Sequence, residues 1–301
     1  MASPASLSAS TRPLGPILGV LFSVLAWGSS FIATKVALQE VSPATVVWLR
    51  FAMGVAVMGL VVLARRQLAL PGWKDLAYFA LLGFIGITFH QWLQSTGLVT
   101  AQAATTAWIV ASTPVFIALL SWLVLKEKLG LRRSAGILLA ALGVLLVVSR
   151  GDFASVAAGR FGAPGDLLIL ISAPNWAVFS VLSRRGLERH PAGRMMFFVM
   201  LFGWLFSSLL FFGGPGLGEV SALTARGWLG VLFLGVVCSG LAYVFWYGAL
   251  QALPASQVGA FLYLEPLAAV LAAGLVLGEP LLWASLLGGL VILLGVWLVQ
   301  N

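Results

Sequence analysis

Residues 98–150 and 250–300 carry one pattern twice. Each stretch closes a block of five apolar segments. Because five is an odd number, the second block must cross a membrane in the direction opposite to the first. Inverted repeats of this kind surround a central binding site in many membrane proteins. Four pairs of identical residues stand 152 positions apart in the two stretches: Pro114 and Pro266, Glu127 and Glu279, Gly136 and Gly288, and Gly143 and Gly295.

The apolar character of the chain sets its class. Hydrophobic residues make up 61% of the sequence and charged residues 9%, with a mean hydropathy of +1.06. This composition predicts an all-α polytopic membrane protein with ten transmembrane helices, each of roughly 20 residues. The single Cys238 excludes an internal disulfide. The predicted spans are about 16–37, 43–64, 76–97, 101–125, 132–149, 165–183, 195–213, 227–250, 254–277 and 281–299.

The basic residues predict the orientation of the chain in the membrane. With the N-terminus in the cytoplasm, twelve Lys and Arg lie in cytoplasmic segments and three in outer loops, while Lys35 and Arg50 lie within spans. The excess of basic residues is then a topology signal, and we expect no nucleic-acid partner. We expect both termini in the cytoplasm and the protein in the inner membrane of a bacterium. The twelve are Arg12, Arg65, Arg66, Lys74, Lys126, Lys128, Arg132, Arg133, Arg184, Arg185, Arg189 and Arg194, and the three are Arg150, Arg160 and Arg226.

The opening helices of the two blocks also match. Ser23 and Trp27 correspond to Ser172 and Trp176 at an offset of 149 residues, as Lys35 corresponds to Arg184. The apolar run after Arg12 is long enough to span the membrane, which argues against a cleaved signal peptide. We predict a mobile N-terminal tail, a first five-helix repeat, a linker and a second, inverted five-helix repeat, at residues 1–11, 12–150, 151–159 and 160–301.

Polar residues inside spans are costly, so each one is a candidate for function. Glu265 lies near the middle of the ninth span, directly before Pro266, which removes a backbone donor and predicts a kink. Its carboxyl group either binds a substrate ammonium group or a proton, or supports packing at the kink. The first repeat has Thr113 and Pro114 at the equivalent place. It therefore duplicates the kink but not the acid.

Four further polar residues lie within the spans. His90 and Gln94, one turn apart, either line a site or bond to a neighbouring helix. Arg50 keeps its charge, and it either attracts a substrate carboxylate or serves the structure. Lys35 either attracts a substrate carboxylate as well or extends toward the outer membrane surface. Only two histidines occur, and no Cys or carboxylate pair has ligand spacing, so we expect no metal and no cofactor.

Aromatic and small polar residues form stripes on several spans. The tryptophans at 27, 108 and 176 are too deep for the interfacial aromatic belt. With their polar neighbours they suit a cavity for a flat apolar ligand with a polar end, and core packing is the alternative. The predicted substrate-binding residues are Trp27, Ser30, Arg50, His90, Gln94, Trp108, Ser112, Asn175, Trp176, Tyr243, Tyr263 and Glu265, with Pro114 and Pro266 as gating kinks.

Two duplicated features have a structural explanation. Glu127 and Glu279 follow the fourth and ninth spans at opposite membrane faces, where they cap helix ends or brace the short turns; a gating salt bridge is the alternative. The paired glycines lie seven residues apart in the fifth and tenth spans, on one helix face. Such a face is typical of close helix packing or of a dimer surface. Both a monomer and a homodimer remain open.

Together these motifs resemble a known family. The sequence Trp-Gly-Ser-Ser-Phe at 27–31 with Lys35 behind it, Leu-Arg-Phe at 49–51, and the duplicated Pro, Glu and Gly positions resemble the EamA family of the drug/metabolite transporter superfamily. The resemblance covers nearly the whole chain. It implies two inverted five-helix repeats around a central cavity and the export of amino acids or other metabolites. With its deep aromatic residues and His90, the chain is most similar to bacterial YddG-type exporters of aromatic amino acids.

We therefore expect an exporter of small amphipathic solutes, aromatic or other apolar amino acids, that works by alternating access. An exporter of drugs or cationic metabolites is the alternative on the same fold, because one deep acid suits a cation equally well. An intramembrane enzyme is disfavoured, since the short basic loops carry no acidic cluster, Walker loop or metal site. The expected contacts are Trp27, Trp108, Trp176 and Tyr263 to the ring, Arg50 or His90 to the carboxylate, and Glu265 to the ammonium group or a coupling proton.

Overall fold

The computed structural model describes residues 14–125, 130–154 and 162–300. In these ranges the regular elements are all helices. They form ten helical segments that are long and apolar enough to cross a membrane. The predicted fold class is therefore confirmed, with span ends that agree to within a few residues. The predicted tail at 1–11, most of the predicted linker and Glu127 lie outside the described residues.

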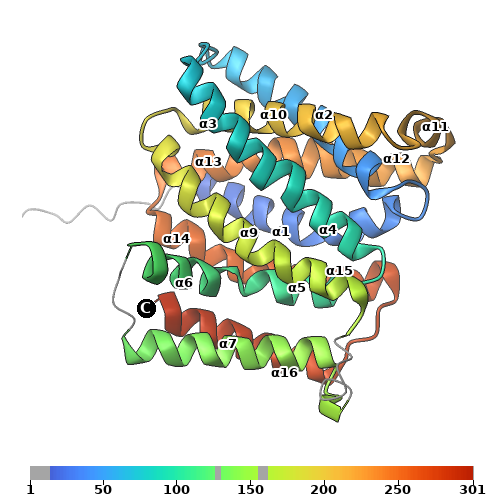
Figure 1. Ribbon diagram of the computed structural model, residues 1–301, viewed down its shortest axis with the longest axis vertical. Coiled ribbons are helices and arrows are strands. Elements are labelled where there is room, and N and C mark those ends of the chain that lie inside the picture. Colours follow the sequence, from blue (N-terminus) through green and yellow to red (C-terminus); the bar gives the residue numbers. More distant parts are fainter. Residues whose placement is uncertain (1–13, 126–129, 155–161, 301) are drawn as a thin grey trace, which may run out of the picture.

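The two halves of the chain have the same order of helices (Figure 1). The first half consists of α1 (Leu14–Ala37), α2 (Pro43–Ala64), a third span of α3 (Trp73–Gly83), η1 (Phe84–Phe89) and α4 (His90–Leu98), a fourth of α5 (Ala103–Ala111) and α6 (Thr113–Leu125), and α7 (Leu131–Ser149). The second half begins with α9 (Pro164–Leu187), α10 (Ala192–Phe212) and the short α11 (Gly216–Ala222). Its eighth span consists of α12 (Ala225–Leu232), η2 (Phe233–Leu241) and α13 (Ala242–Ala252). The ninth span consists of α14 (Ala255–Ala260), η3 (Phe261–Leu264), α15 (Glu265–Ala272) and η4 (Ala273–Leu277), and the tenth is α16 (Trp283–Gln300).

Irregular turns recur at matching positions in the two halves. The π-helical stretches η1 and η2 begin at Phe84 and Phe233, which are 149 residues apart. The fourth span breaks between α5 and α6, and the ninth passes through the 3-10 turn η3. Pro114 and Pro266 directly follow these breaks. A proline inside a helix removes a donor and clashes with the preceding turn, so the predicted kinks coincide with interruptions of the helices.

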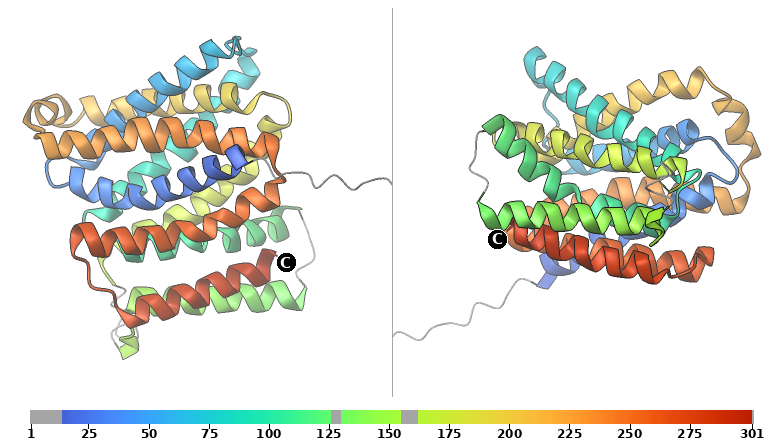
Figure 2. Two further views of the ribbon diagram at one scale, coloured as in Figure 1. Left: turned by 180° about the vertical axis from the view of Figure 1, so that it is seen from behind. Right: turned by 60° about the horizontal axis from the view of Figure 1, so that its bottom comes forward.

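Contacts between the halves follow the duplication (Figures 1 and 2). Helix α1 packs against the eighth span, as α9 packs against the third; α1 also packs against the ninth span, as α9 does against the fourth. The pairs α2 with α10 and α7 with α16 each join equivalent helices. Exchanging the two halves maps these contacts onto one another, which is the pattern of a two-fold axis.

Helices α7 and α16 show that the two halves run in opposite directions. A methyl group added at Gly136 would stand 2.7 Å from the carbonyl oxygen of Gly295, and one at Gly143 would stand 2.7 Å from that of Gly288. Residue numbers therefore rise along one helix while they fall along the other. The predicted packing role of these glycines is confirmed within one chain, because backbones that approach so closely leave no room for a side chain.

Candidate functional site

A cavity of about 380 Å³ lies between the two halves. Its lining follows α9 to Leu187, α13 to Leu250 and α16 to Gln300, at the left of Figure 1. We call this side, where α16 ends, the C-terminal face, and the other side the opposite face. Among the described residues, none of the loops at the opposite face lines the cavity. The cavity therefore extends from the middle of the protein toward the C-terminal face only.

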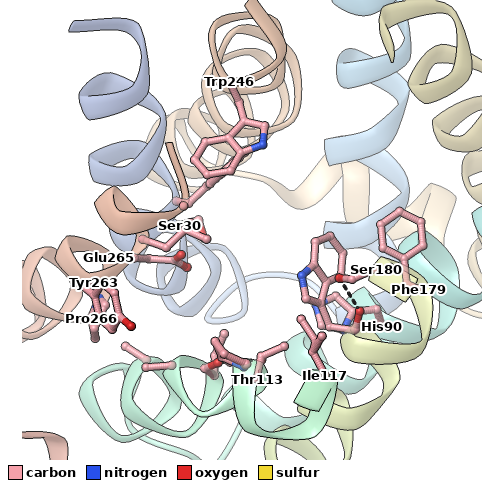
Figure 3. A pocket seen from close by; sticks show the side chains of 18 of the residues that line it. Ser30, His90, Thr113, Ile117, Phe179, Ser180, Trp246, Tyr263, Glu265 and Pro266 are labelled. Atoms are coloured by element: carbon pink, nitrogen blue, oxygen red, sulfur yellow. Dashed lines mark hydrogen bonds between the residues drawn. The ribbon is translucent and has the colours of Figure 1, made fainter. Parts of the chain in front are cut away.

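The acid of the cavity is Glu265, the first residue of α15. Figure 3 shows its carboxyl group beside Tyr263 on one wall, across the cavity from His90 and Ser180. The side chain is half-buried and, within the described part of the chain, makes no hydrogen bond or ion pair. The next residue, Pro266, is accepted at the first turn of a helix because its missing N–H needs no partner there. The proline thus fixes the helix start that places the acid on the wall.

The base of the cavity is Arg50 on α2, which is 7% exposed. Its Nε donates to Ser239 Oγ at 2.7 Å, and its Nη1 donates to Gln91 Oε1 at 3.0 Å. Both acceptors are neutral, and among the described residues no carboxylate lies within 4.0 Å of the guanidinium group. A guanidinium group has five N–H donors. Its position is thus fixed by two of them, while others remain for an anion in the cavity.

Two aromatic clusters flank these charges. Trp27 lies with its ring centroid 5.4 Å from that of Tyr243 and 5.1 Å from that of Trp246. Trp176, which is the repeat equivalent of Trp27, lies 4.7 Å from His90. Tilted and edge-to-face pairs at these distances are the favoured geometries of aromatic rings. The duplication thus supplies the cavity with two preformed aromatic walls.

Nine of the twelve predicted substrate-binding residues line the cavity: Trp27, Ser30, Arg50, His90, Gln94, Trp176, Tyr243, Tyr263 and Glu265. Pro114 and Pro266 line it as well. The remaining three residues, Trp108, Ser112 and Asn175, do not line this cavity. Trp108 packs on Gly289 of α16, where a methyl group would stand 2.4 Å from the indole ring. Ser112, at the break between α5 and α6, donates to the carbonyl oxygen of Ile109 at 2.6 Å, and Asn175 donates to the carbonyl oxygen of Ile85 at 2.9 Å.

The structure adds lining residues that were not predicted, among them Gln91, Trp246 and Tyr247. Two signals in the sequence point to them. An amide at membrane depth is costly, so Gln91 stands out beside His90. Trp246 and Tyr247 follow Tyr243 by about one helical turn, on the same face. Binding of a substrate by any lining residue stays a prediction.

Lys35 and Glu279 lie apart from the cavity. The Lys35 Nζ atom is 3.7 Å from Glu279 Oε1 at the opposite face, and it also donates to the carbonyl oxygen of Ala101. Glu279 accepts from two backbone N–H groups at the start of α5. The predicted capping role of Glu279 is thus present, and Lys35 has a partner within the protein.

Ten helices in two inverted halves around a cavity that extends to one face are the architecture of a secondary transporter. The EamA-like transporter family matches the chain twice, at residues 14–149 and 163–300, and the chain belongs to this family. It is similar to the uncharacterized transporter YdfC of Bacillus subtilis, at 30% identity over 277 residues, 90% of this chain and 86% of the relative.

Two further similarities cover nearly the whole chain. An uncharacterized transporter of Archaeoglobus fulgidus is 27% identical over 280 residues, which are 92% of this chain and 94% of the relative. A crystal structure with 25% sequence identity has a TM-score of 0.64 and covers 96% of this chain and 97% of its own. Family and fold therefore agree that this is a membrane transporter.

Proposed function

We propose that the protein exports small amphipathic solutes, namely aromatic or other apolar amino acids, across the inner membrane. One observation carries the proposal: the cavity holds an acid, Glu265, and a buried base, Arg50, that form no ion pair with each other or with another described residue. Opposite charges that are fixed apart in an apolar cavity complement the ammonium and carboxylate groups of an amino acid. Such a solute would satisfy both charges at once.

The size and walls of the cavity support the same class of solute. Its volume of about 380 Å³ lies near the lower end of the range of small-molecule sites, roughly 300–1,000 Å³. The clusters around Trp27 and Trp176 offer flat apolar surfaces to a side chain. An aromatic ring gains free energy from such surfaces both by burial and by ring geometry.

The direction of transport follows from the predicted topology. If both termini are cytoplasmic, the C-terminal face is the cytoplasmic one and the cavity takes up solute from the cell. The repeats 12–150 and 160–301 would then exchange roles, with movement at Pro114 and Pro266, and open the cavity to the opposite face. The bilayer and the solute are the partners in this mechanism, which needs no cofactor, metal or nucleic acid and is compatible with a monomer or a homodimer.

Counterflow in proteoliposomes tests the proposal. We expect L-phenylalanine to exchange faster than phenethylamine, which lacks the carboxylate, and faster than 3-phenylpropionate, which lacks the ammonium group. Replacement of Glu265 by Gln should lower phenylalanine exchange about tenfold or more, because a desolvated charge partner is worth at least 1.4 kcal/mol. Glu188→Gln, on the exposed surface, is the matched control and should exchange like the parent. Unchanged exchange in Glu265→Gln would remove this acid from the binding site.

One observation favours a second candidate, an exporter of drugs or cationic metabolites. Glu265 lies in the same cavity as several aromatic rings, and rings attract cations through their π faces. In that case phenethylamine would exchange faster than phenylalanine and would compete with it. The panel of three solutes therefore separates the two candidates.

A further inference from the structure

A cluster of contacts joins the two halves at the opposite face, the face that the cavity does not reach. Glu279, which follows η4, accepts from Ala103 N at 2.9 Å through Oε1 and from Ala104 N at 3.1 Å through Oε2. Lys35, near the end of α1, lies 3.7 Å from Glu279 Oε1 and donates to the carbonyl oxygen of Ala101. We call these five residues the Glu279 cluster. It ties α1 and the fourth span of one half to the ninth span of the other.

The hydrogen bonds of the Glu279 cluster are stronger than those between neutral groups. A carboxylate that accepts from the first N–H groups of a helix satisfies donors that have no partner inside the helix, and it interacts favourably with the helix dipole. Hydrogen bonds to an ionised group are roughly twice as strong as neutral ones. The side chains of Lys35 and Glu279 are 23% and 10% exposed. Solvent therefore screens the cluster only in part.

The cluster lies at the ends of the two spans that have breaks. The fourth span is interrupted between α5 and α6, and the ninth at η3, both beside the cavity. On the far side of each break, the segment that extends to the opposite face ends in the cluster: α5 through Ala103, and α15 with η4 through Glu279. A rotation at the breaks would separate these two ends and leave the rest of each span in place.

At the C-terminal face, the residue equivalent to Lys35 has a different ion-pair partner. Arg184, the repeat equivalent of Lys35, has an 81% exposed side chain, and its Nε lies 3.7 Å from Oε1 of Glu188, the residue that follows α9. It therefore makes an ion pair within one half. Among the described residues, Lys35 thus pairs with a carboxylate of the other half, whereas Arg184 pairs with one of its own half.

From these contacts we infer that the Glu279 cluster is the gate that closes the cavity toward the opposite face. Its opening is the step that would release solute there, so the gate rests on the alternating access proposed above. Breaking the cluster shifts the protein toward a state in which the cavity is accessible from the opposite face.

Thiol labelling tests the gate without any transport assay. The parent for the test carries Cys238→Ser and Ala111→Cys, since Ala111 lines the cavity. A membrane-impermeant maleimide should modify the new thiol in inside-out vesicles and only slowly in spheroplasts, where it arrives from the opposite face. Adding Glu279→Ala should raise the rate in spheroplasts roughly tenfold, the change that corresponds to about 1.4 kcal/mol. Adding Glu188→Gln should leave both rates unchanged.

A second variant keeps the test decisive if Glu279→Ala does not fold. Ala103 is the first residue of α5 and follows Gln102, whose φ of −78° and ψ of 145° are extended. Proline is favoured at this first position and requires an extended residue before it. Ala103→Pro therefore keeps the helix start but removes one of the two backbone N–H groups that Glu279 accepts from. We expect the same rise in labelling from the opposite face.

The outcomes separate the gate from the proposed function. Slow labelling in spheroplasts for folded Glu279→Ala and Ala103→Pro would overturn the gate, whatever the proteoliposomes transport. Failure of both variants to fold would also overturn it, because a gate must open without unfolding. Lack of counterflow for all three solutes, with labelling that rises as expected, would instead refute the proposed substrates and leave the gate.

Discussion

The two membrane faces of the protein connect the halves in different ways. At the opposite face, three glutamates bridge them. Besides Glu279, Glu40 after α1 accepts from the N and the Oγ1 of Thr224 at 2.7 Å each. Glu219 on α11 accepts from Ser42 N at 3.1 Å and Ser42 Oγ at 2.8 Å, and also from Thr45. These bonds join the second half to the ends of α1, α2 and the fourth span.

At the C-terminal face, an ion pair and two hydrogen bonds join α3 to the region of α9. His190 Nε2 lies 3.5 Å from Asp75 Oδ1, and Tyr78 donates to the carbonyl oxygen of Leu182 and accepts from Gly186 N. These contacts connect α3 with α9 or the residues that follow it, and the guanidinium group of Arg132 on α7 lies 5.0 Å from the ring centroid of Trp297 on α16. The opposite face is thus joined by hydrogen bonds on several sides, whereas at the C-terminal face no hydrogen bond or ion pair joins the fourth span to the ninth within the described residues.

Acidic and basic residues of the chain are concentrated at different membrane faces. The Lys and Arg residues gather toward the C-terminal face and predict the orientation. The bridging glutamates gather at the opposite face, where each one accepts from backbone N–H groups of the other half or of its helix ends. Both kinds of residue lie near the membrane surface, and the glutamates at the opposite face join the halves there.

The largest effect that we expect from one methyl group is at the opposite face. A Cβ atom at Gly165 would stand 1.9 Å from the carbonyl oxygen of Gly97 and 2.7 Å from Thr100 Oγ1. We expect Gly165→Ala to lower the free energy of unfolding by about 3 kcal/mol, the upper range for overpacking. Thermal unfolding in detergent measures the change.

Gly259→Ala is the matched control toward the C-terminal face. A Cβ atom at Gly259 would have no atom within 4 Å, and alanine favours a helix by up to about 1 kcal/mol. We expect equal or higher stability. Similar destabilisation by the two substitutions would contradict the contrast between a closely packed and an open face.

A smaller effect should appear at Glu219, and it should depend on pH. Burial raises the pKa of this carboxyl group, but hydrogen bonds from Thr45 and Ser42 outweigh burial and leave the pKa below its ordinary value. A lowered pKa stabilises the folded protein at neutral pH, and this contribution is lost as the pH falls from the unfolded value of about 4.3 through the folded pKa. Glu219→Gln should cost about 1 kcal/mol at pH 7.

The pH profile provides the decisive measurement for Glu219. Unfolding of the parent between pH 7 and pH 3 should show a loss of stability in the acidic window, and Glu219→Gln should lose less over the same window. Parallel profiles for the two proteins would show that the hydrogen bonds to Glu219 do not hold this carboxylate in its ionised form.

Particular residues show why the sequence predicts the fold better than the site. The ten spans and their inversion follow from hydrophobic length and an odd number of helices, which are properties of the chain alone. Trp108 and Trp176 look alike in the sequence, since both are deep and have small polar neighbours. Yet Trp176 faces the cavity, whereas Trp108 packs against Gly289. Which tryptophan is covered depends on the path of α16, and no local pattern encodes that path.

The polar groups of the cavity also show which features of the site the sequence predicts and which it does not. A charged residue in a span must face away from lipid, so Glu265 and Arg50 could be predicted from the sequence. That Arg50 would be held by Gln91 and Ser239 could not be predicted, because these residues come from the third and eighth spans and meet Arg50 only after the helices have packed. Partners on other spans are a property of the assembled helices.

The smallest expected effect is at Glu188, at the C-terminal face. Its pair with Arg184 has side chains that are 67% and 81% exposed and joins residues four apart at the end of α9. Such exposed pairs contribute about 0.3–0.5 kcal/mol, because water screens the charges and both side chains lose freedom. Glu188→Gln should therefore change the unfolding temperature by no more than the scatter of repeated scans. The substitution is chemically the same as Glu219→Gln, so a larger loss at Glu188 would mean that bridging between the halves is not what makes a glutamate stabilising in this protein.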